Sequence, residues 1–559
     1  MAPFQNRRLG PFGGLNQNEN PHAIPPNDLI KAPNVVHRGD DLGTRPGAIL
    51  EKTGKQYAAA TTGAQPIQGL HEHRENVDAG RHLLAVGWDG VGSGAQPNGQ
   101  NVFFDDASLL PDSATINEGQ DFVWTFATHN NNTFAAGGKT RADSFWYFDG
   151  NTGTGATAIA AVDSGAVALY PSFVHAWRNY LFIGGLNPAT PLADNNASTV
   201  RFADFASDPT VATNWKTGNT IGFTAYGKSH NTGITNFRDN SGDYLLLLYN
   251  DHIETVRLDP QSGFNVPFFI NDKIANGCVN QRAYISLGLD AGDAIYVSER
   301  GIHTLQQSQQ YGEKADTFIS WKIRPFFKTL NRDRLKYTVG AYDFRNGRVV
   351  IAMSTGSNSA HDVIACLDVK RDEKITAKNA RWTFWTLGGS KFVNELKMLR
   401  DEDNVPRLYF GTTTGEVGYF DDDTFTDLGS SYTSEFQTAH DSWGSTATQK
   451  NIGDVTVTLS PGGTYKPTMR LHFDYGRKVS TPRLLTMPSP AGGKFGTAVF
   501  GVDVFGSDSA VRDEKVYGSG SGRTVGFSVS HAGQPFFVSS IDYQGRVVGE
   551  DTGDTASGA

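Results

Sequence analysis

The chain has 559 residues, of which 63 are glycine and 11% are aromatic, while only 19% are charged and the formal net charge is −9. This composition excludes a helical bundle and disorder throughout, and it favours many short strands joined by tight turns, because glycine adopts turn dihedrals and aromatic rings fill pleated surfaces. The mildly acidic net charge lacks the excess of Lys and Arg that is typical of proteins that bind nucleic acid tightly, although it is compatible with the lining of a channel through which DNA passes. Two cysteines, Cys278 and Cys366, cannot staple so long a chain, so nothing indicates an oxidising compartment, and we expect neither a membrane span nor a secretion signal.

Residues 1–50 are predicted to form an extended arm. Seven prolines fall within the first 48 residues, with asparagine and glycine between them. Proline removes a backbone donor and fixes φ, so we expect no continuous sheet here but a segment that lies on another surface at low ordering cost. Arg7, Arg8 and Arg45 flank the arm. They could pair with acidic groups of an adjoining subunit, or they could be ordinary solvated charges.

Residues 51–430 repeat one local pattern, in which a short apolar strand is followed by small or turn residues and then by a second strand. The pattern recurs every 48 to 65 residues, near the 40–50 residues of a four-stranded propeller blade. It predicts an all-β fold built on a β-propeller of about seven blades, with six or eight also compatible. Two successive β-sandwiches are the alternative, because their strands also follow one another at short intervals. The repeats are anchored on Leu84, Phe134, Phe182, Leu247, Tyr296, Ile351 and Tyr409.

One stretch interrupts the repeat. From Asp316 onward, Ile319, Ile323 and Phe326 follow one another at near-helical spacing. Pro325 would break or kink a long helix at this point. A short connecting helix between blades is therefore expected.

Residues 431–559 are predicted to form a separate, small, sandwich-like β domain. Apolar and polar residues alternate cleanly in the segments from Asp454 and Thr468, as in strands with one solvated face. Further strands are expected from Thr497, Arg523 and Pro535. The last ten residues are polar and are expected to form a flexible tail.

The candidate metal ligands are weak. His71 and His73 lie two apart and would share one face of a strand, but no third ligand is identifiable by spacing, so a solvated strand is the better interpretation. Asp421, Asp422 and Asp423, with Asp427, resemble a calcium loop in composition only, since the alternating spacing and the closing glutamate are missing. A hairpin turn at a blade edge explains them more simply, and adventitious calcium is the alternative.

No catalytic or cofactor-binding residue is nominated. The glycines at Gly518, Gly520 and Gly522 lack the flanking strand, helix and lysine of a phosphate-binding loop, and they fit a flexible connection better. Glu435 and Asp474 could in principle belong to a glycosidase pair, but pairing across a propeller cannot be inferred from spacing. We therefore expect no metal, no cofactor and no enzymatic activity.

The N-terminal arm carries the most specific signal. The segment GGLNQNENPHAIPPNDLIKAPNVVHRGDDLGTRPG resembles the opening of a family of tailed-bacteriophage virion proteins, the tail-nozzle (tail tubular protein B, or packaged-DNA stabilisation) type. The strands near the C-terminus, RTVGFSVSHAGQPFFVSSIDYQGRV, also look like those of this family. The middle of the chain resembles the family only in the spacing of its repeated strands. The match in the arm is carried by Gly13, Gly14, Leu15, Asn16, Asn20, Pro21, Pro25, Pro26, Asn34, Val35, Arg45, Pro46 and Gly47.

This resemblance implies a structural protein of the virion tail, assembled in the host cytoplasm. In the family, six copies form a ring that continues the portal–adaptor channel, retains packaged DNA, opens for ejection and offers a side to fibres or spikes. Genomic DNA would pass through the lumen without specific binding. A head–tail connector, hub or receptor-binding ring protein is one alternative, and a virion-borne propeller glycosidase or depolymerase is the other.

Overall fold

The computed structural model describes residues 4–51, 59–60, 63–64, 66–74, 81–88, 100–104, 107–108, 123–137, 145–150, 157–159, 169–188, 199–203, 208–211, 214–215, 219–221, 230–239, 242–258, 268–288, 293–307, 314–369, 374–460, 465–487, 511–518 and 520–550. The expected strand from Thr497 and the polar tail from residue 551 lie outside these residues.

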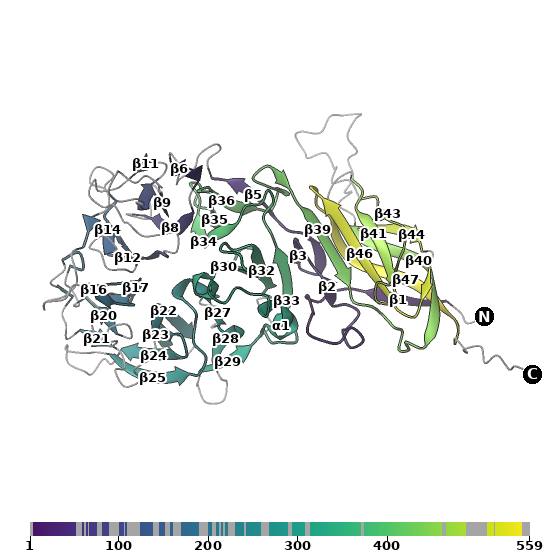
Figure 1. The fold of residues 1–559 in the computed structure, drawn as a ribbon, viewed down its shortest axis with the longest axis horizontal. Helices are drawn as coiled ribbons and strands as arrows, with labels where there is room; N and C mark the ends of the chain where they lie inside the picture. Colours follow the sequence, from purple (N-terminus) through teal and green to yellow (C-terminus); the bar gives the residue numbers. More distant parts are fainter. Residues whose placement is uncertain are drawn as a thin grey trace, which may run out of the picture.

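The larger part of the molecule is a seven-bladed β-propeller, on the left in Figure 1. Six blades are four-stranded antiparallel sheets built from strands in nearly consecutive order. The first strands of most neighbouring blades contact one another around the ring, and the first strand of the fourth blade meets the turn that precedes the fifth. The first strand of the seventh blade, β34, meets β8 of the first, so the ring is closed. The first blade holds β8 (Ile67–His73), β9 (His82–Trp88), β10 (Gln100–Phe104) and β11 (Ala107–Ser108), the second β12 (Thr125–His129), β13 (Asn132–Ala136), β14 (Phe145–Phe148) and β15 (Thr157–Ala158), and the third β17 (Phe173–Trp177), β18 (Tyr180–Gly184), β20 (Val200–Phe202) and β21 (Thr220–Ile221). The fourth blade holds β22 (Asn231–Asp239), β23 (Gly242–Tyr249), β24 (Ile253–Leu258) and β25 (Phe268–Ile274), and the fifth β26 (Tyr284–Ser286), β27 (Ala294–Ser298), β28 (Gly301–Gln307) and β29 (Lys314–Phe318). The sixth blade holds β30 (Val339–Asp343), β31 (Arg348–Met353), β32 (Val363–Asp368) and β33 (Arg381–Trp385), and the seventh β34 (Val393–Arg400), β35 (Pro406–Thr412), β36 (Val417–Asp421) and β5 (Gly47–Leu50).

The sequence anchors confirm the repeat. Each of the seven anchor residues lies on the second strand of a different blade, from Leu84 on β9 to Tyr409 on β35. All seven are fully buried, at 0% exposure. The second strand of each blade pairs with a strand on either side and is covered by a neighbouring blade on both faces. Its residues are therefore apolar without alternation, and this apolar run is what makes the repeat recognisable in the sequence.

The seventh blade differs from the others in its fourth strand. Here β5 pairs antiparallel with β36, from Gly418 opposite Leu50 to Asp421 opposite Gly47, so a strand from the beginning of the chain closes the propeller. Two short strands extend this blade, and two two-stranded ribbons stand apart from the blades. These are β37 (Thr426–Asp427), β38 (Ser430–Ser431), β6 (Ala59–Ala60) with β7 (Gly63–Ala64), and β16 (Leu169–Tyr170) with β19 (Asn187–Pro188).

The smaller part, on the right in Figure 1, is a sandwich of two sheets with a common apolar core. The alternation expected in this region is confirmed, because Val455, Val457 and Leu459 of one sheet point inward and meet Met469 and Leu471 of the other. The first sheet holds β1 (Gln5–Leu9), β3 (Val35–Arg38), β4 (Asp41–Thr44), β40 (Thr448–Ser460), β44 (Arg512–Tyr517), β45 (Ser521–Gly522) and β47 (Phe537–Glu550), and the second holds β2 (Leu29–Lys31), β39 (Thr433–Thr438), β41 (Thr468–Phe473), β42 (Lys478–Val479), β43 (Arg483–Leu484) and β46 (Val525–Ala532).

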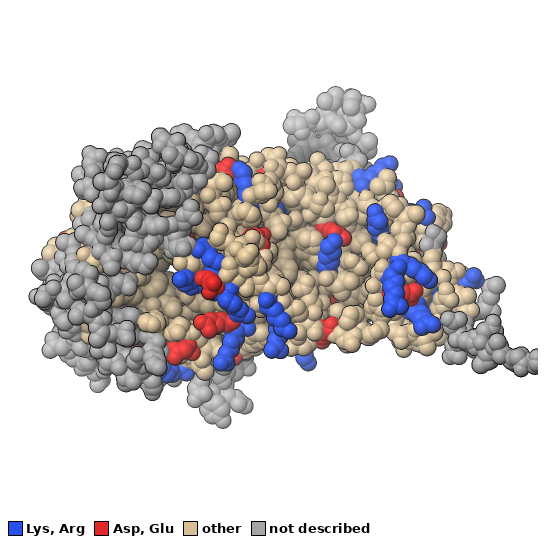
Figure 2. Space-filling view, in the orientation of Figure 1, with Lys and Arg blue, Asp and Glu red and all other residues tan. Residues whose placement is uncertain are grey.

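Helical structure among the described residues is confined to short turns. The expected connection between blades five and six contains the 3-10 turn η5 (Trp321–Ile323), the α-helix α1 (Arg324–Phe327) and the turn η6 (Leu335–Tyr337), with Pro325 in the first turn of α1, where its missing N–H costs nothing. A third turn, η4 (Gln281–Ala283), precedes the fifth blade. None of these is long enough to cross a membrane. Figure 2 shows charged side chains of both signs scattered over the described surface on one face.

Candidate functional site: the junction held by the N-terminal arm

The arm lies on its own chain. Four of its segments are strands of the sandwich, β1 to β4, and the fifth is the closing strand of the propeller, β5. The arm forms no continuous sheet of its own, and its five short strands instead join three different sheets. The reason is that most of the prolines fall between these strands, or outside the ladders in which a backbone N–H is required. In Figure 1 the purple arm runs among the yellow strands of the C-terminal region.

Arg45 is the centre of the junction. Its guanidinium is fully buried and forms a bidentate ion pair with Asp427, with Nη1 2.9 Å from Oδ1 and Nη2 bonded to Oδ2. The same group donates to the carbonyls of Pro46 and Thr386, and it lies 3.8 Å from the ring centroid of Tyr432. The suggestion that Arg45 pairs with an adjoining subunit is corrected, because burial and a fixed planar fork of donors commit it to this chain.

Asn34 completes this buried network. Its backbone has a positive φ of 54°, a conformation that asparagine tolerates better than most residues. This turn lets its amide oxygen accept from Arg45 Nε at 3.1 Å, while its own N–H donates to the Phe384 carbonyl on β33 at 2.7 Å. The next residue, Val35, accepts a hydrogen bond from Trp385 Nε1. One turn of the arm therefore joins the sandwich to the sixth blade.

The first half of the arm motif touches the propeller at β33. Leu15 is buried and donates its N–H to the Trp382 carbonyl at 2.9 Å. Gly14 lies so close to this strand that a Cβ would collide with its backbone, which explains the glycine physically. Asn16, buried beside them, donates to Asp28 at 3.0 Å.

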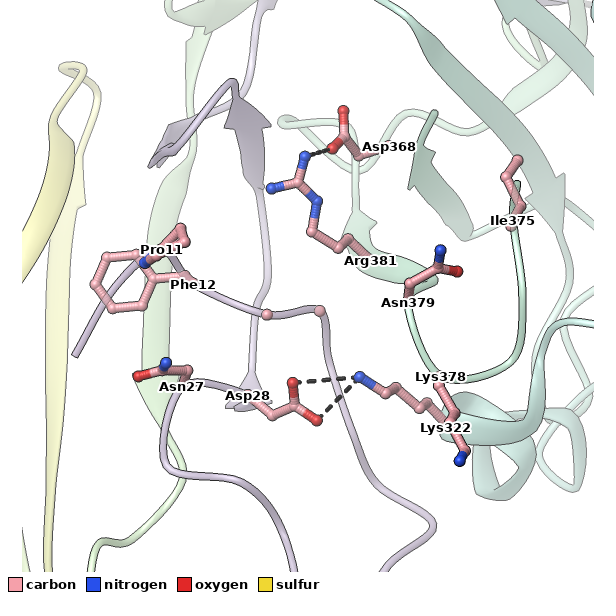
Figure 3. A pocket seen from close by; sticks show the side chains of 12 residues that line it. Pro11, Phe12, Asn27, Asp28, Lys322, Asp368, Ile375, Lys378, Asn379 and Arg381 are labelled. Carbon is pink, nitrogen blue, oxygen red and sulfur yellow. Dashed lines mark hydrogen bonds and ion pairs between the residues drawn. The ribbon is translucent and has the colours of Figure 1, made fainter. Parts of the chain in front are cut away.

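Beside this contact the arm and the sixth blade enclose a polar cavity of about 250 Å³ (Figure 3). Asp28 extends from the arm toward Lys322 of η5, and the closest approach of Oδ2 to Nζ is 3.0 Å. Both side chains are nearly buried, at 8% and 10% exposure. Arg381, on the opposite wall, pairs with Asp368. The Asp28–Lys322 pair therefore fastens the arm to η5, whereas the Arg381–Asp368 pair joins two strands of the sixth blade.

The other motif residues divide into two groups. Pro46 and Gly47 are buried where the arm enters the seventh blade, and a Cβ at Gly47 would meet the carbonyls of Thr424 and Thr426. Asn20, Pro21, Pro25 and Pro26 are not brought to the junction, and they form a more exposed turn in which Asn20 accepts from the His22 N–H and Pro25 from the Asp28 N–H.

The candidate metal ligands have other partners. His71 and His73 do face one side of β8, where His71 bonds to Thr128 and His73 to Thr133 on the second blade. The expected solvated strand is wrong for His73, which is fully buried. Nowhere in the part of the chain that the structure describes do three histidine, cysteine or carboxylate side chains converge as metal ligands would.

The aspartate run is spread over several ion pairs. Asp421 pairs with Arg407, Asp422 with Arg38 and Arg348, and Asp427 with Arg45. The run lies at the end of β36 and in the turn that follows, as a hairpin turn at a blade edge requires.

The remaining candidates lie in the sandwich. Glu435 on β39 pairs with Lys31 of the arm, and Asp474 accepts from the Arg523 N–H in a turn after β41. Gly522 belongs to β45, and Gly520 has a φ of 155° that glycine tolerates best. Cys278 and Cys366 are buried free thiols, and burial raises the pKa of each to about 12.

Sequence reasoning missed a charged cluster on the innermost strands. Glu395 of β34 is buried and bonds to Arg282 of η4, while Lys397 lies two residues further along β34. Burial lowers the pKa of Lys397 and raises that of Glu395, and Arg282 opposes the second shift. Burial also lowers the pKa of His175 to about 4, so its ring is neutral near pH 7. No spacing rule could find this cluster, because its members come from strands far apart in the chain.

The comparisons with known proteins concern the fold. No family model matches the sequence, and no curated protein matches it. Similar solved structures include BBS1N in complex with ARL6DN (8% identity, TM-score 0.38, 68% of this chain and 98% of that chain), the N-terminal domain of Nup159 (11%, 0.34, 70% and 97%) and an exo-beta-1,3-galactanase from Phanerochaete chrysosporium (9%, 0.26, 75% and 95%). At these identities the likeness is one of fold alone.

Proposed function

We propose that this chain is a structural protein of a bacteriophage tail, a subunit of the nozzle ring that continues the portal–adaptor channel, retains packaged DNA and opens for ejection. The observation that carries the proposal is the arm. Residues 13–47, through which the sequence resembles this family, are also the segment that fastens the sandwich to the propeller through buried contacts. A ring subunit that bears load between neighbours needs its two parts held in one orientation, and this junction supplies that rigidity.

The sandwich offers a surface suited to neighbouring subunits. Four of its exposed large apolar residues lie along the strands at one side of the two sheets, where Val479 and Leu484 are on the short strands that pair with β41, and Val511 and Tyr517 lie at the two ends of β44. Their exposures run from 46% to 72%, and the Thr486 N–H donates to Glu514 across the two sheets at this edge. Exposed apolar groups clustered on a sheet edge are typical of protein interfaces.

The glycosidase alternative requires two carboxylates about 5–10 Å apart in an open cleft. On the innermost strands, Glu395 bonds to Arg282, Glu72 to Arg74 and Asp343 to Asn346 of its own turn. A bonded neighbour does not stop a carboxylate from acting in catalysis, so our preference for the structural role rests on the arm. A connector, hub or receptor-binding ring protein would use the same junction, and its position in the particle distinguishes it from a nozzle.

Native mass spectrometry and electron microscopy of the purified chain test the proposal. We expect a closed homo-oligomeric ring, and Leu484→Glu with Tyr517→Glu should convert it into folded monomers. Val211→Glu, at a comparably exposed apolar position on the propeller, is the matched control and should leave the ring intact. A wild-type chain that stays monomeric in solution and is absent from purified virions would refute the proposal.

A further inference from the structure

A second hollow lies on the propeller, between the hairpin of β27 and β28 and the helix α1. Its volume is about 590 Å³, within the range of sites for small ligands. Figure 2 shows Lys and Arg side chains over this part of the propeller, with Asp and Glu side chains among them. The side chains that matter are those of Arg300, His303, Phe318, Arg324, Phe327 and Lys328.

The cations on the rim are not neutralised from within. Arg300, Arg324 and Lys328 are exposed, and none of the three forms an ion pair with a carboxylate that the structure describes. One exposed carboxylate, Glu299, also lines the hollow, so the rim keeps an excess of positive charge that favours an anionic group such as a phosphate monoester.

The walls are held in place before any ligand arrives. Arg332 donates from Nη1 to the Glu299 carbonyl at 2.6 Å and from Nη2 to the Phe327 carbonyl at 3.1 Å. These bonds tie the hairpin to α1. A cavity fixed in this way spends less binding energy on ordering its own groups.

The floor is a buried imidazole. His303 is 4% exposed, and its Nδ1 lies 3.1 Å from the Asp316 carboxylate, close enough for a charge contact but without the geometry of a hydrogen bond. Nε2 is buried and has no hydrogen-bond partner among the described residues. Burial lowers the pKa of this ring, with Arg300 acting in the same direction and Asp316 opposing it, so the ring is neutral near pH 7 and one of its two nitrogens can accept a hydrogen bond.

The aromatic groups supply an apolar wall. The ring of Phe318 stands edge-on to His303, with the centroids 5.4 Å apart, and Tyr296 stacks on the other side of the imidazole at 5.3 Å. A half-buried Phe318 beside a hydrogen-bond acceptor and a cationic rim matches a ligand with an apolar face, a hydroxyl group and an anionic group.

We propose that this cavity binds a phosphorylated sugar unit. The phosphate pairs with Arg300, Arg324 and Lys328, the apolar face of the sugar ring rests on Phe318, and a sugar hydroxyl forms a hydrogen bond with His303 Nε2. The cations surround one hollow and form no track along the surface, so a single phosphate fits better than a nucleic-acid backbone, which needs a row of contacts. The site is separate from the arm junction and does not depend on the tail function.

Isothermal titration of the full chain with glucose 6-phosphate, glucose, inorganic phosphate and a deoxythymidine oligonucleotide tests the proposal. We expect glucose 6-phosphate to bind at least tenfold more tightly than any of the other three. Arg300→Gln and Lys328→Gln should each weaken it about tenfold, because each removes one charge-assisted contact. Lys478→Gln, at an exposed lysine of the sandwich, is the matched control and should leave the affinity unchanged.

A second variant separates sugar recognition from anion binding. His303→Phe should abolish the advantage of glucose 6-phosphate over inorganic phosphate while the affinity for inorganic phosphate is retained. If this buried variant does not fold, as judged by circular dichroism, the two exposed-residue variants still decide the outcome. Absence of binding, equal affinity for inorganic phosphate, or tighter binding of the oligonucleotide would each overturn the proposal.

Discussion

The first six blades and the rest of the molecule are built in different ways. Each of those blades takes its four strands from one stretch of chain, so its sheet is complete once that stretch is folded. The seventh blade and both sheets of the sandwich depend on strands from residues 5–50, which return to pair with residues near 417–421, 433–438 and 537–550. Sheets completed by nearby strands form the repeated blades, whereas sheets completed by distant strands join the two ends of the chain.

This difference separates stability from folding speed. Closing a loop of several hundred residues costs only slightly more entropy than closing a short one, because the cost grows with the logarithm of length. The contacts that the arm makes are nevertheless between residues far apart in the sequence, and such non-local contacts slow folding. The arm therefore adds a rigid junction at a small cost in loop-closure entropy. Changes to the arm and its partners measure how much of the free energy of unfolding depends on this junction.

Deleting residues 1–50 should have the largest effect. It removes β5 from the seventh blade and β1 to β4 from the sandwich, which uncovers β36, β39 and β47 in three different sheets and takes away buried core residues such as Leu29 and Val35. We expect an insoluble or molten chain without a cooperative thermal transition, in place of a folded propeller that has lost only its ability to assemble. Removing residues 1–4 alone is the control and should preserve the transition. A cooperative, soluble product from the long deletion would show that the six local blades are self-sufficient.

Breaking the Arg45–Asp427 pair comes next. Arg45→Met leaves a carboxylate that is 1% exposed without its main counter-charge, and loss of one partner of a buried pair costs about 3–5 kcal/mol. Replacing both residues, Arg45→Met with Asp427→Leu, should cost less than the sum of the single changes. Urea unfolding of the four chains gives the coupling energy. Additive effects would show that the two side chains act independently of each other.

Much of the propeller could be predicted from the sequence, while the junction could not. The anchors from Leu84 to Tyr409 were visible because a strand buried on both faces is written as an apolar run. Arg45 was singled out, but its partner Asp427 lies 382 residues away, and no local rule connects them. The arm strands were missed for the same reason: three- to five-residue strands such as β2 and β5 have no periodicity of their own and exist only because another segment pairs with them.

The stability of the first six blades should depend on pH through a buried histidine. His361 is buried beside the sixth blade, with Nδ1 2.9 Å from the Ser354 hydroxyl and Nε2 3.0 Å from the Tyr337 carbonyl, and burial lowers its pKa to about 3. The unfolded ring has a pKa near 6.5 and accepts a proton that the folded ring refuses. Stability is therefore complete above pH 6.5 and is lost as the pH falls from there toward the folded value, by about 2–3 kcal/mol at pH 4.5.

His361→Gln tests this effect through the difference between the unfolding free energies at pH 7 and pH 4.5. The difference should be smaller in the variant by about the amount given by the pKa shift, roughly 2 kcal/mol. Some of it should remain, because burial also lowers the pKa of His175, to about 4. An equal difference in the two chains would mean that His361 titrates in the folded state as it does in the unfolded state.

The smallest effect is expected at a second ion pair of the arm. Lys31 of β2 lies 2.6 Å from Glu435 of β39, so this pair also joins the arm to the sandwich, but the lysine side chain is 52% exposed. Water solvates both charges when they separate, and an exposed pair contributes about 0–1 kcal/mol that salt screens further. Lys31→Ala should therefore shift the urea midpoint slightly at low salt and not at all in about 1 M sodium chloride, where the Debye length is about 3 Å. A loss as large as that of Arg45→Met would mean that the number of arm contacts sets the strength of the junction, whereas the structure indicates that burial does.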